Sequence, residues 1–211
     1  PSNDFAAYLA SGMTDASLLT GDYPDDGWGW KKDDVEKKYW FVAYYAHWIM
    51  QRELLPAIET LSQAALLAHD PEQARRYAHK CALLLWQLAE YYPDYDYTAQ
   101  SRMGEERGSY HGRITNAIWE CNTPRFVAPA YDAIRPFLPQ DAKLQQSTDM
   151  TAAEIDDHIR QRLVVETARL IVDQTPYIRG IYGSHQRSAA ILAAVLDEHD
   201  QHPTSQEIID Y

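Results

Sequence analysis

Apolar residues recur at three- and four-residue intervals through most of the chain, the spacing of the buried face of an α-helix. No segment carries the period-two alternation of a half-buried strand. The pattern predicts helices at residues 34–51, 56–68, 71–91, 114–121, 124–137, 151–174 and 188–196.

Helix-capping residues mark two of these predicted starts. Asp70, Pro71 and Glu72 supply an N-cap, a proline at the first helical position and an acid in the first turn. Thr151, with Glu154 three residues later, forms the pattern of a capping box. Both patterns support the helices that follow them.

The connections between the predicted helices alternate between short and long. Pro56 suits the first turn of a second helix directly after the first, and this tight connection predicts an antiparallel pair. Residues 93–112 are predicted to form a long loop, and residues 139–150 a polar linker. The chain is therefore predicted to be all-α and built from successive antiparallel hairpins, as an (α/α) toroid or a helical solenoid.

Composition adds a hint about ligands. The chain contains 15 Tyr and 6 Trp but only 4 Phe. Rings with an apolar face and a polar group suit a surface that faces carbohydrate. A formal net charge of −12 argues against a nucleic-acid partner, which needs clustered Lys and Arg. A polyanionic sugar needs only a local basic site and is not excluded by this charge.

The cysteines, the apolar stretches and the two ends of the chain further limit the possible classes of protein. Cys81 and Cys121 are too few for a disulfide scaffold or a cysteine zinc site, and free thiols on or beside helices are expected. No apolar stretch has the length of a membrane span, and no secretory signal is present. Because the chain begins at Pro1 and ends at Tyr211, where another helix starts, we expect one helical domain, 1–211, cut from a longer protein.

The segment 177–186 concentrates glycines, aromatic rings, an arginine and a histidine directly before the apolar helix. Ser184 is the predicted N-cap and His185 falls in the first turn. Amide groups at a helix N-terminus favour an anion there, and Arg179 could supply a charge-assisted contact to it. The plainer interpretation is a glycine-containing helix–helix connection.

Seven segments spread over nearly the whole chain together point to one family. They are 26–30 (DGWGW), 39–48 (YWFVAYYAHW), 77–82 (YAHKCA), 91–97 (YYPDYDY), 118–120 (IWE), 131–134 (YDAI) and 182–186 (YGSHQ). In their order and spacing they resemble the helical domain of heparinase II/III-type polysaccharide lyases.

This resemblance implies an incomplete (α/α) toroid followed by a β-sandwich domain, with the active site in the cleft between them. It implies cleavage of uronic-acid polysaccharides by β-elimination, in the periplasm or outside the cell. The implied partner is an acidic polysaccharide, with no nucleic acid, no membrane span and no cofactor or metal in this segment. A structural metal in the missing domain and the oligomeric state stay open, and the isolated chain is expected to be inactive.

The resemblance also assigns roles around the start of the last long helix. His185 matches the family's toroid histidine and is expected to hold the uronate carboxylate with Arg179, Gln186 and the adjacent amides. Tyr182 is a candidate proton donor, although the family's catalytic tyrosine normally lies on a later helix, beyond this chain. Ser184 stands where family members often carry asparagine, which leaves the details of carboxylate neutralisation open.

A second candidate sugar-binding set surrounds the predicted helix at 114–121. Asn116 and Glu120 are four residues apart and share a helix face, where they could bind sugar hydroxyls beside Trp119. The alternative is that Asn116 and Glu120 tie down the long loop while Trp119 packs in the core. The remaining candidates for substrate binding are Tyr110, His111 and Arg113 at the helix start, and Trp28 and Trp30 in a loop that favours sugar stacking.

Two other classes of function stay open. A toroid glycoside hydrolase needs two carboxylates that flank the bond, and Asp26 with Glu120 is the pair that we would nominate. A helical carbohydrate-binding or protein-interaction scaffold would bind without reacting. His47, inside an apolar helix, is expected to be a core histidine, and His199 and His202 are expected to be surface residues without a third metal ligand.

Overall fold

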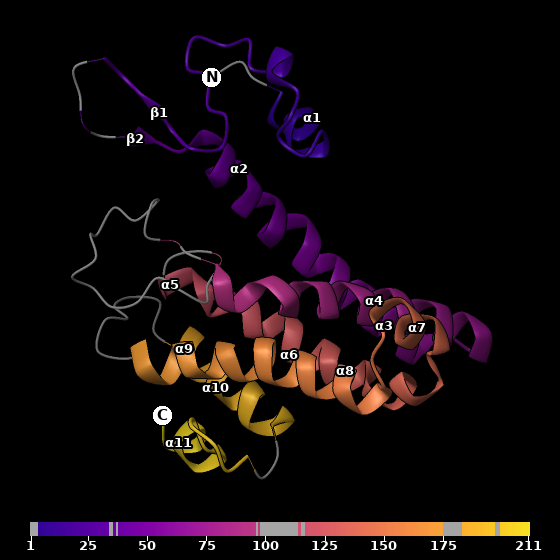
Figure 1. Ribbon diagram of the computed structural model, residues 1–211. Coiled ribbons are helices and arrows are strands. Elements are labelled where there is room, and N and C mark those ends of the chain that lie inside the picture. Colours follow the sequence, from indigo (N-terminus) through magenta and orange to yellow (C-terminus); the bar gives the residue numbers. More distant parts are fainter. Residues whose placement is uncertain are drawn as a thin grey trace.

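The structure is a computed structural model of the chain, shown in Figure 1. It describes residues 4–33, 36, 38–95, 97, 114, 117–174, 183–196 and 199–211. Helices account for most of these residues, which confirms the predicted all-α class. Within the described ranges, no helix combines the length and the apolar character that a bilayer crossing requires.

The chain forms a small N-terminal part and a larger helical body, joined by α2 (Figure 1). Elements η1, η3 and η6 are 3-10 turns, and η2 and η7 are π-helical stretches. The helical elements are α1 Phe5–Ala10, η1 Ala16–Leu18, α2 Phe41–Ile49, η2 Met50–Leu54, α3 Leu55–Leu67, α4 Pro71–Tyr91, η3 Tyr92–Asp94, α5 Ala117–Glu120, α6 Asn122–Ile134, η6 Arg135–Gln140, α7 Ala142–Thr148, α8 Ala152–Ile159, η7 Arg160–Val165, α9 Glu166–Gln174, α10 Ser184–Val195 and α11 Ser205–Asp210.

A short antiparallel hairpin, β1 Trp30–Lys31 and β2 Lys38–Tyr39, precedes the first long helix. The sequence predicted a helix from residue 34, and this prediction is wrong because α2 begins only at Phe41. The buried carboxylate of Asp25 fixes that start: its Oδ2 accepts the backbone N–H of Phe41 at 2.7 Å and of Val42 at 3.1 Å. These first-turn amides have no partner within the helix itself.

The predicted antiparallel pair at Pro56 is also wrong. The chain remains helical from α2 through the π-helical η2 into α3, so the three elements form one continuous run. Pro56 lies in the first turn of α3. A proline inside a helix removes one N–H and its ring crowds the preceding turn, and a π-helical stretch is one way a helix accommodates such a disturbance.

The body is built on the antiparallel pair α3 and α4, which three residues connect. The predicted cap of α4 is confirmed, because the carboxylate of Asp70 accepts the backbone N–H of Glu72 at 3.0 Å. Helix α6 packs across both α3 and α4, and α8 and η7 pack on α4. The side chains that fill this core without solvent exposure include Leu55, Ile58, Leu85, Val127 and Ile134. Each stabilises the fold by roughly 1.5–3 kcal/mol relative to an exposed position.

The polar segment at 139–150 is not a linker but contains η6 and the short helix α7. The carboxylate of Asp141 caps α7 by accepting the N–H of Leu144 at 3.1 Å, and it also lies 2.9 Å from His79 Nδ1 on α4. Leu144 is the buried residue of α7. A single apolar position gives no periodicity, which explains why the sequence pattern missed this helix.

The last helices confirm two predictions and correct a third. Thr151 and Glu154 form the predicted capping box at the start of α8, and α8, η7 and α9 continue as one helical run. His202 is exposed as predicted, with half of its side chain accessible (52%). His199, predicted to be a surface residue, is buried with 4% exposure, because its ring packs beside Arg160 of η7.

Candidate functional site

Helix α10 carries His185, the strongest site prediction, in its first turn. Ser184 is the first helical residue rather than the predicted N-cap, and Gly183 precedes it with φ 88°. This backbone conformation favours glycine. The N–H of Gly183 donates to Gln186 Oε1 at 3.0 Å, which holds Gln186 back against the helix start. His185 itself is buried, with 3% exposure.

A buried hydrogen bond joins α10 to the start of α6. Ser188 Oγ donates to the backbone carbonyl of Cys121 at 2.6 Å, and both residues are buried. His185 lies three residues before Ser188, so the two side chains share one face of α10. Glu120 directly precedes Cys121. The histidine and the carboxylate are therefore carried by two segments that Ser188 holds together.

Glu120 ends α5 and is fully buried, with 0% exposure. Its Oε1 accepts two hydrogen bonds, from the hydroxyl of Tyr92 at 2.8 Å and from Thr123 Oγ1 at 2.7 Å. A buried carboxylate requires such donors because the loss of hydration is costly. Glu120 thus links η3, α5 and α6, a placement that favours a positioning role over direct contact with a sugar.

Burial and nearby charged groups raise the pKa values of two acidic groups close to Glu120. Burial raises the pKa of the Cys121 thiol, the charge of Glu120 raises it further, and Arg187 partly opposes this. Burial likewise raises the pKa of Tyr95, with Tyr91 and Glu120 adding to the effect. Both groups therefore stay protonated at neutral pH, and Cys121 is no thiolate nucleophile.

The two cysteines match the sequence prediction. Cys81 and Cys121 are buried free thiols on or beside helices. Burial raises the pKa of Cys81 to about 12, and its thiol points to the backbone carbonyl of Ile58. Neither residue has the exposure of a reactive cysteine.

The structure brings several predicted site residues to this junction of α5, α6 and α10. His185 and Glu120 are buried, Ser184 is partly exposed, and Gln186 is exposed. Trp119 is also exposed (51%), so the alternative that Trp119 packs in the core is wrong. The remaining predicted residues lie outside the described part of the chain: Arg179, Tyr182, Tyr110, His111, Arg113 and Asn116.

The two tryptophans of the N-terminal loop do not join this cluster. Trp28 and Trp30 belong to the hairpin region at the far end of α2, whereas α10 lies on the opposite side of the body (Figure 1). Trp30 packs edge-on against Tyr23, with ring centroids 4.8 Å apart. Trp28 is 75% exposed.

The carboxylate pair nominated for a hydrolase is not assembled. Asp26 is exposed in the loop before β1, where its Oδ1 accepts the N–H of Trp28 at 3.0 Å. Glu120 is enclosed at the end of α5, in the body below α2 (Figure 1). The two carboxylates therefore do not flank a common site, which removes the specific support for hydrolysis.

His47 is only partly buried, and its Nδ1 has no hydrogen-bond partner in the described chain. Its ring meets those of Tyr44 and Tyr97 edge-on, at centroid distances of 5.2 and 6.0 Å. Burial lowers the pKa of His47, so it is neutral at physiological pH. The predicted core histidine with its hydrogen bonds satisfied is therefore not what the structure shows: the ring packs against aromatic rings but is only partly buried, and its Nδ1 lacks a partner among the described residues.

A surface hollow of about 460 Å³ lies elsewhere, between the α3–α4 connection and η6. Its lining includes Leu66, Arg75 and Phe137 but neither histidine nor carboxylate. Across the described residues, no three His, Cys, Asp or Glu side chains are grouped so that they could hold a metal ion. The two predicted site residues that the structure buries, His185 and Glu120, are both at the α5–α6–α10 junction.

Sequence reasoning missed three members of this junction: Tyr92, Thr123 and Ser188. Thr123 follows Glu120 by one helical turn and could have been paired with it by spacing. Tyr92 is 28 residues from Glu120, and Ser188 is 67 residues from Cys121. No local pattern reports contacts over such separations.

Comparison of the chain with known protein families, curated proteins and solved structures gave no match. The fold and the junction define an all-α protein in which a buried histidine on α10 and a buried carboxylate on α5 are carried by helices that both pack on α6. The lyase resemblance stays a prediction.

Proposed function

We propose that this chain is the helical part of a polysaccharide lyase that cleaves uronic-acid-containing polysaccharide by β-elimination. One observation carries the proposal: buried His185 lies in the first turn of α10, on the face that Ser188 joins to Cys121, the residue after the buried Glu120. The helical fold and the family resemblance of the segments around these residues support it. We also propose that the helices belong to an incomplete (α/α) toroid.

The chemistry explains why a histidine would be needed here. A base removes the C5 proton of the uronate, its electrons form the C4–C5 double bond, and the C4–O bond breaks as the leaving oxygen takes a proton. The C5 proton is too weakly acidic unless the charge that develops on the carboxylate is stabilised. A histidine N–H and the backbone amides at the start of a helix are groups of this kind.

Glu120 is proposed to position the histidine-bearing helix rather than to touch the sugar. Its carboxylate takes hydrogen bonds from Tyr92 and Thr123, and the next residue receives the Ser188 hydroxyl. This arrangement holds the start of α10 in place. A catalytic group must be held within a fraction of an ångström of its productive position for full effect. Tyr182, three residues before His185, is proposed as a proton donor.

The test is a lyase assay on the natural protein, which on this proposal carries a β-sandwich domain beside this helical part. The ultraviolet absorbance of the new double bond is followed on alginate, heparin and polygalacturonate. His185→Ala should lower kcat by about a hundredfold or more, as expected for loss of a group that stabilises the developing charge. His202→Gln, at an exposed position, serves as the matched control.

Each other outcome has a defined meaning. Wild-type kcat in a folded His185→Ala variant would overturn the assigned site. New reducing ends without ultraviolet absorbance would identify a hydrolase. Binding without turnover on every polymer would identify a scaffold.

A further inference from the structure

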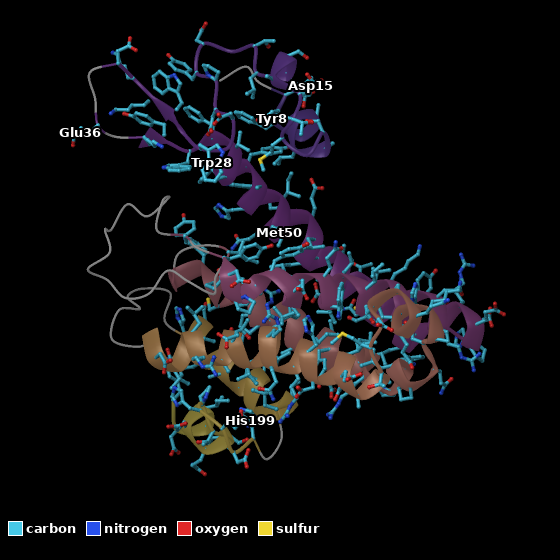
Figure 2. All side chains as sticks on the ribbon, in the orientation of Figure 1. Tyr8, Asp15, Trp28, Glu36, Met50 and His199 are labelled. Atoms are coloured by element: carbon cyan, nitrogen blue, oxygen red, sulfur yellow. The ribbon has the colours of Figure 1, made fainter. Side chains whose placement is uncertain are left out.

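The loop that carries Trp28 is unusually well fixed. Besides starting α2, the buried carboxylate of Asp25 accepts the backbone N–H groups of Gly27 at 2.9 Å and Gly29 at 2.8 Å, on either side of Trp28. Both glycines have positive φ, 104° and 86°, which other residues rarely adopt. Figure 2 shows Trp28 at the base of the hairpin, beside the start of α2. The loop geometry is thus set by one buried charge.

Both backbone polar groups of Trp28 are also occupied. Its N–H donates to Asp26 Oδ1 at 3.0 Å, and its carbonyl accepts from Lys38 Nζ at 3.1 Å. From the other side, the Tyr8 hydroxyl donates to the Asp26 carbonyl at 3.0 Å. The indole is nevertheless 75% exposed, more than any other aromatic side chain of the described residues. An exposed aromatic ring on a fixed backbone loses less conformational freedom on binding than one on a mobile loop.

Two lysines of the hairpin that follows Trp28 indicate the charge of the partner. Lys31 and Lys38 stand directly opposite each other in the antiparallel ladder, so their side chains share one face of the hairpin. Like charges in this arrangement are destabilising. Neither ammonium group has a carboxylate partner in the part of the chain that the structure describes. An anionic ligand would relieve this repulsion.

We propose that Trp28, Lys31 and Lys38 form a second binding surface for acidic polysaccharide, separate from His185. One sugar ring stacks on the indole, and the carboxylates of the polymer pair with the two ammonium groups. Such a polymer offers an apolar ring face and a carboxylate in every unit. A single ligand can therefore both stack on the indole and pair with the ammonium groups. The ligand class rests on the proposed function, but binding at this surface does not require turnover.

The position of this surface supports a role in holding the polymer rather than cutting it. In Figure 1 the hairpin and α10 lie at opposite sides of the molecule, with α2 leading from one to the body. A long chain could contact both places, whereas a short oligosaccharide reaches only one. Loss of Trp28 should therefore affect long polymers more than short ones.

The experiment measures binding of alginate, heparin and polygalacturonate decamers to the chain by calorimetry, with a neutral dextran fragment as the reference ligand. Trp28→Ala should weaken the Kd for the bound acidic decamer about tenfold, as for an interface tryptophan, and Trp28→Phe should restore most of it. Lys31→Gln should weaken Kd about threefold and reduce its dependence on salt. Tyr91→Ala, which removes another exposed aromatic ring (55%), is the matched control.

The failures of this inference and of the proposed function are distinguishable. Unchanged affinity in Trp28→Ala, equal binding of dextran, or no binding of any acidic decamer overturns the second surface whatever the lyase assay gives. Trp28-dependent binding in a protein without lyase activity keeps this surface and removes the proposed reaction. If Trp28→Ala instead changes the oligomeric state, the exposed ring is a protein contact and the proposal is wrong.

Discussion

His199 Nδ1 accepts a hydrogen bond from the guanidinium of Arg160 at 3.2 Å, which joins the segment before α11 to η7. Because arginine can only donate, the ring must be neutral with its proton on Nε2. Figure 2 shows His199 beside α10 and α11, at the side of the body away from the hairpin. The backbone N–H of His199 also donates to Ser205 Oγ at 2.7 Å, so this histidine connects η7 to the start of α11.

The first prediction concerns stability in acid. Burial lowers the pKa of His199, Arg160 lowers it further and Arg169 adds to this, while Asp200 acts in the opposite direction. The unfolded state therefore binds more protons just below the ordinary histidine pKa of about 6.5. The stabilisation is complete above that value and is lost as pH falls through the lowered folded-state pKa.

His199→Gln keeps an acceptor for Arg160 but cannot be protonated, so it should reduce the loss of unfolding free energy between neutral pH and pH 5. Urea unfolding at several pH values measures this slope. His47 and His158, whose pKa values burial also lowers, should retain part of the slope. An unchanged slope in His199→Gln would show that the lowered pKa of His199 does not contribute to the loss of stability in acid.

The second prediction concerns His202 and the opposite pH dependence, a loss of stability as pH rises. His202 Nε2 lies 2.7 Å from Asp173, and its Nδ1 lies 3.2 Å from Glu207. The hydrogen bond to Asp173 raises the pKa of His202, and Glu207 adds to this. Its stabilisation is therefore complete below the ordinary pKa and is lost as pH rises through the raised folded-state pKa. His202→Gln should remove a small decline in stability above neutral pH, and high salt should have the same effect because the groups are exposed. If the decline in stability remains after both the substitution and the addition of salt, another group causes it.

The third prediction concerns Asp25. Replacing it with Ala leaves four backbone N–H groups without their acceptor, which should destabilise the N-terminal part by about 3 kcal/mol or more. Hydrogen exchange should then accelerate at the amides that Asp25 holds, those of Gly27, Gly29, Phe41 and Val42. Asp26→Ala, which removes an exposed neighbouring carboxylate, should change stability by no more than about 0.5–1 kcal/mol. Equal effects of the two substitutions would contradict the role of Asp25.

The sequence pattern correctly predicted those features of the fold that depend on residues close together in the chain. The caps at Asp70 and Thr151 were correct, because an N-cap acts on amides two or three residues away. The start of α2 was wrong because the deciding residue, Asp25, lies 16 residues before Phe41. His199 was placed at the surface because its partner is 39 residues away on another helix. Periodicity carries no information on such contacts.

The same distinction between local and distant contacts decides which parts of the candidate site could be predicted from the sequence. His185 was found because it stands at a recognisable helix start, and its burial and its link to α6 could not be predicted. Glu120 was found through its helical spacing, either as a sugar ligand or as a residue that ties down the long loop. Its enclosure depends on the Tyr92 hydroxyl, which reaches it from the end of another helical run.

The last prediction tests that enclosure. Tyr92→Phe and Thr123→Val each remove one donor to Glu120 Oε1 and should each lower the unfolding free energy by about 1.5–3 kcal/mol, as for hydrogen bonds to a buried charge. Because both donors serve one oxygen, the double variant should depart from the sum of the single effects by at least about 0.5 kcal/mol. Glu120→Gln should recover part of the loss in the double variant, since a neutral amide needs less compensation than a carboxylate. Strictly additive single effects, with no recovery by Glu120→Gln, would mean that Glu120 is not the charge that these hydroxyls stabilise.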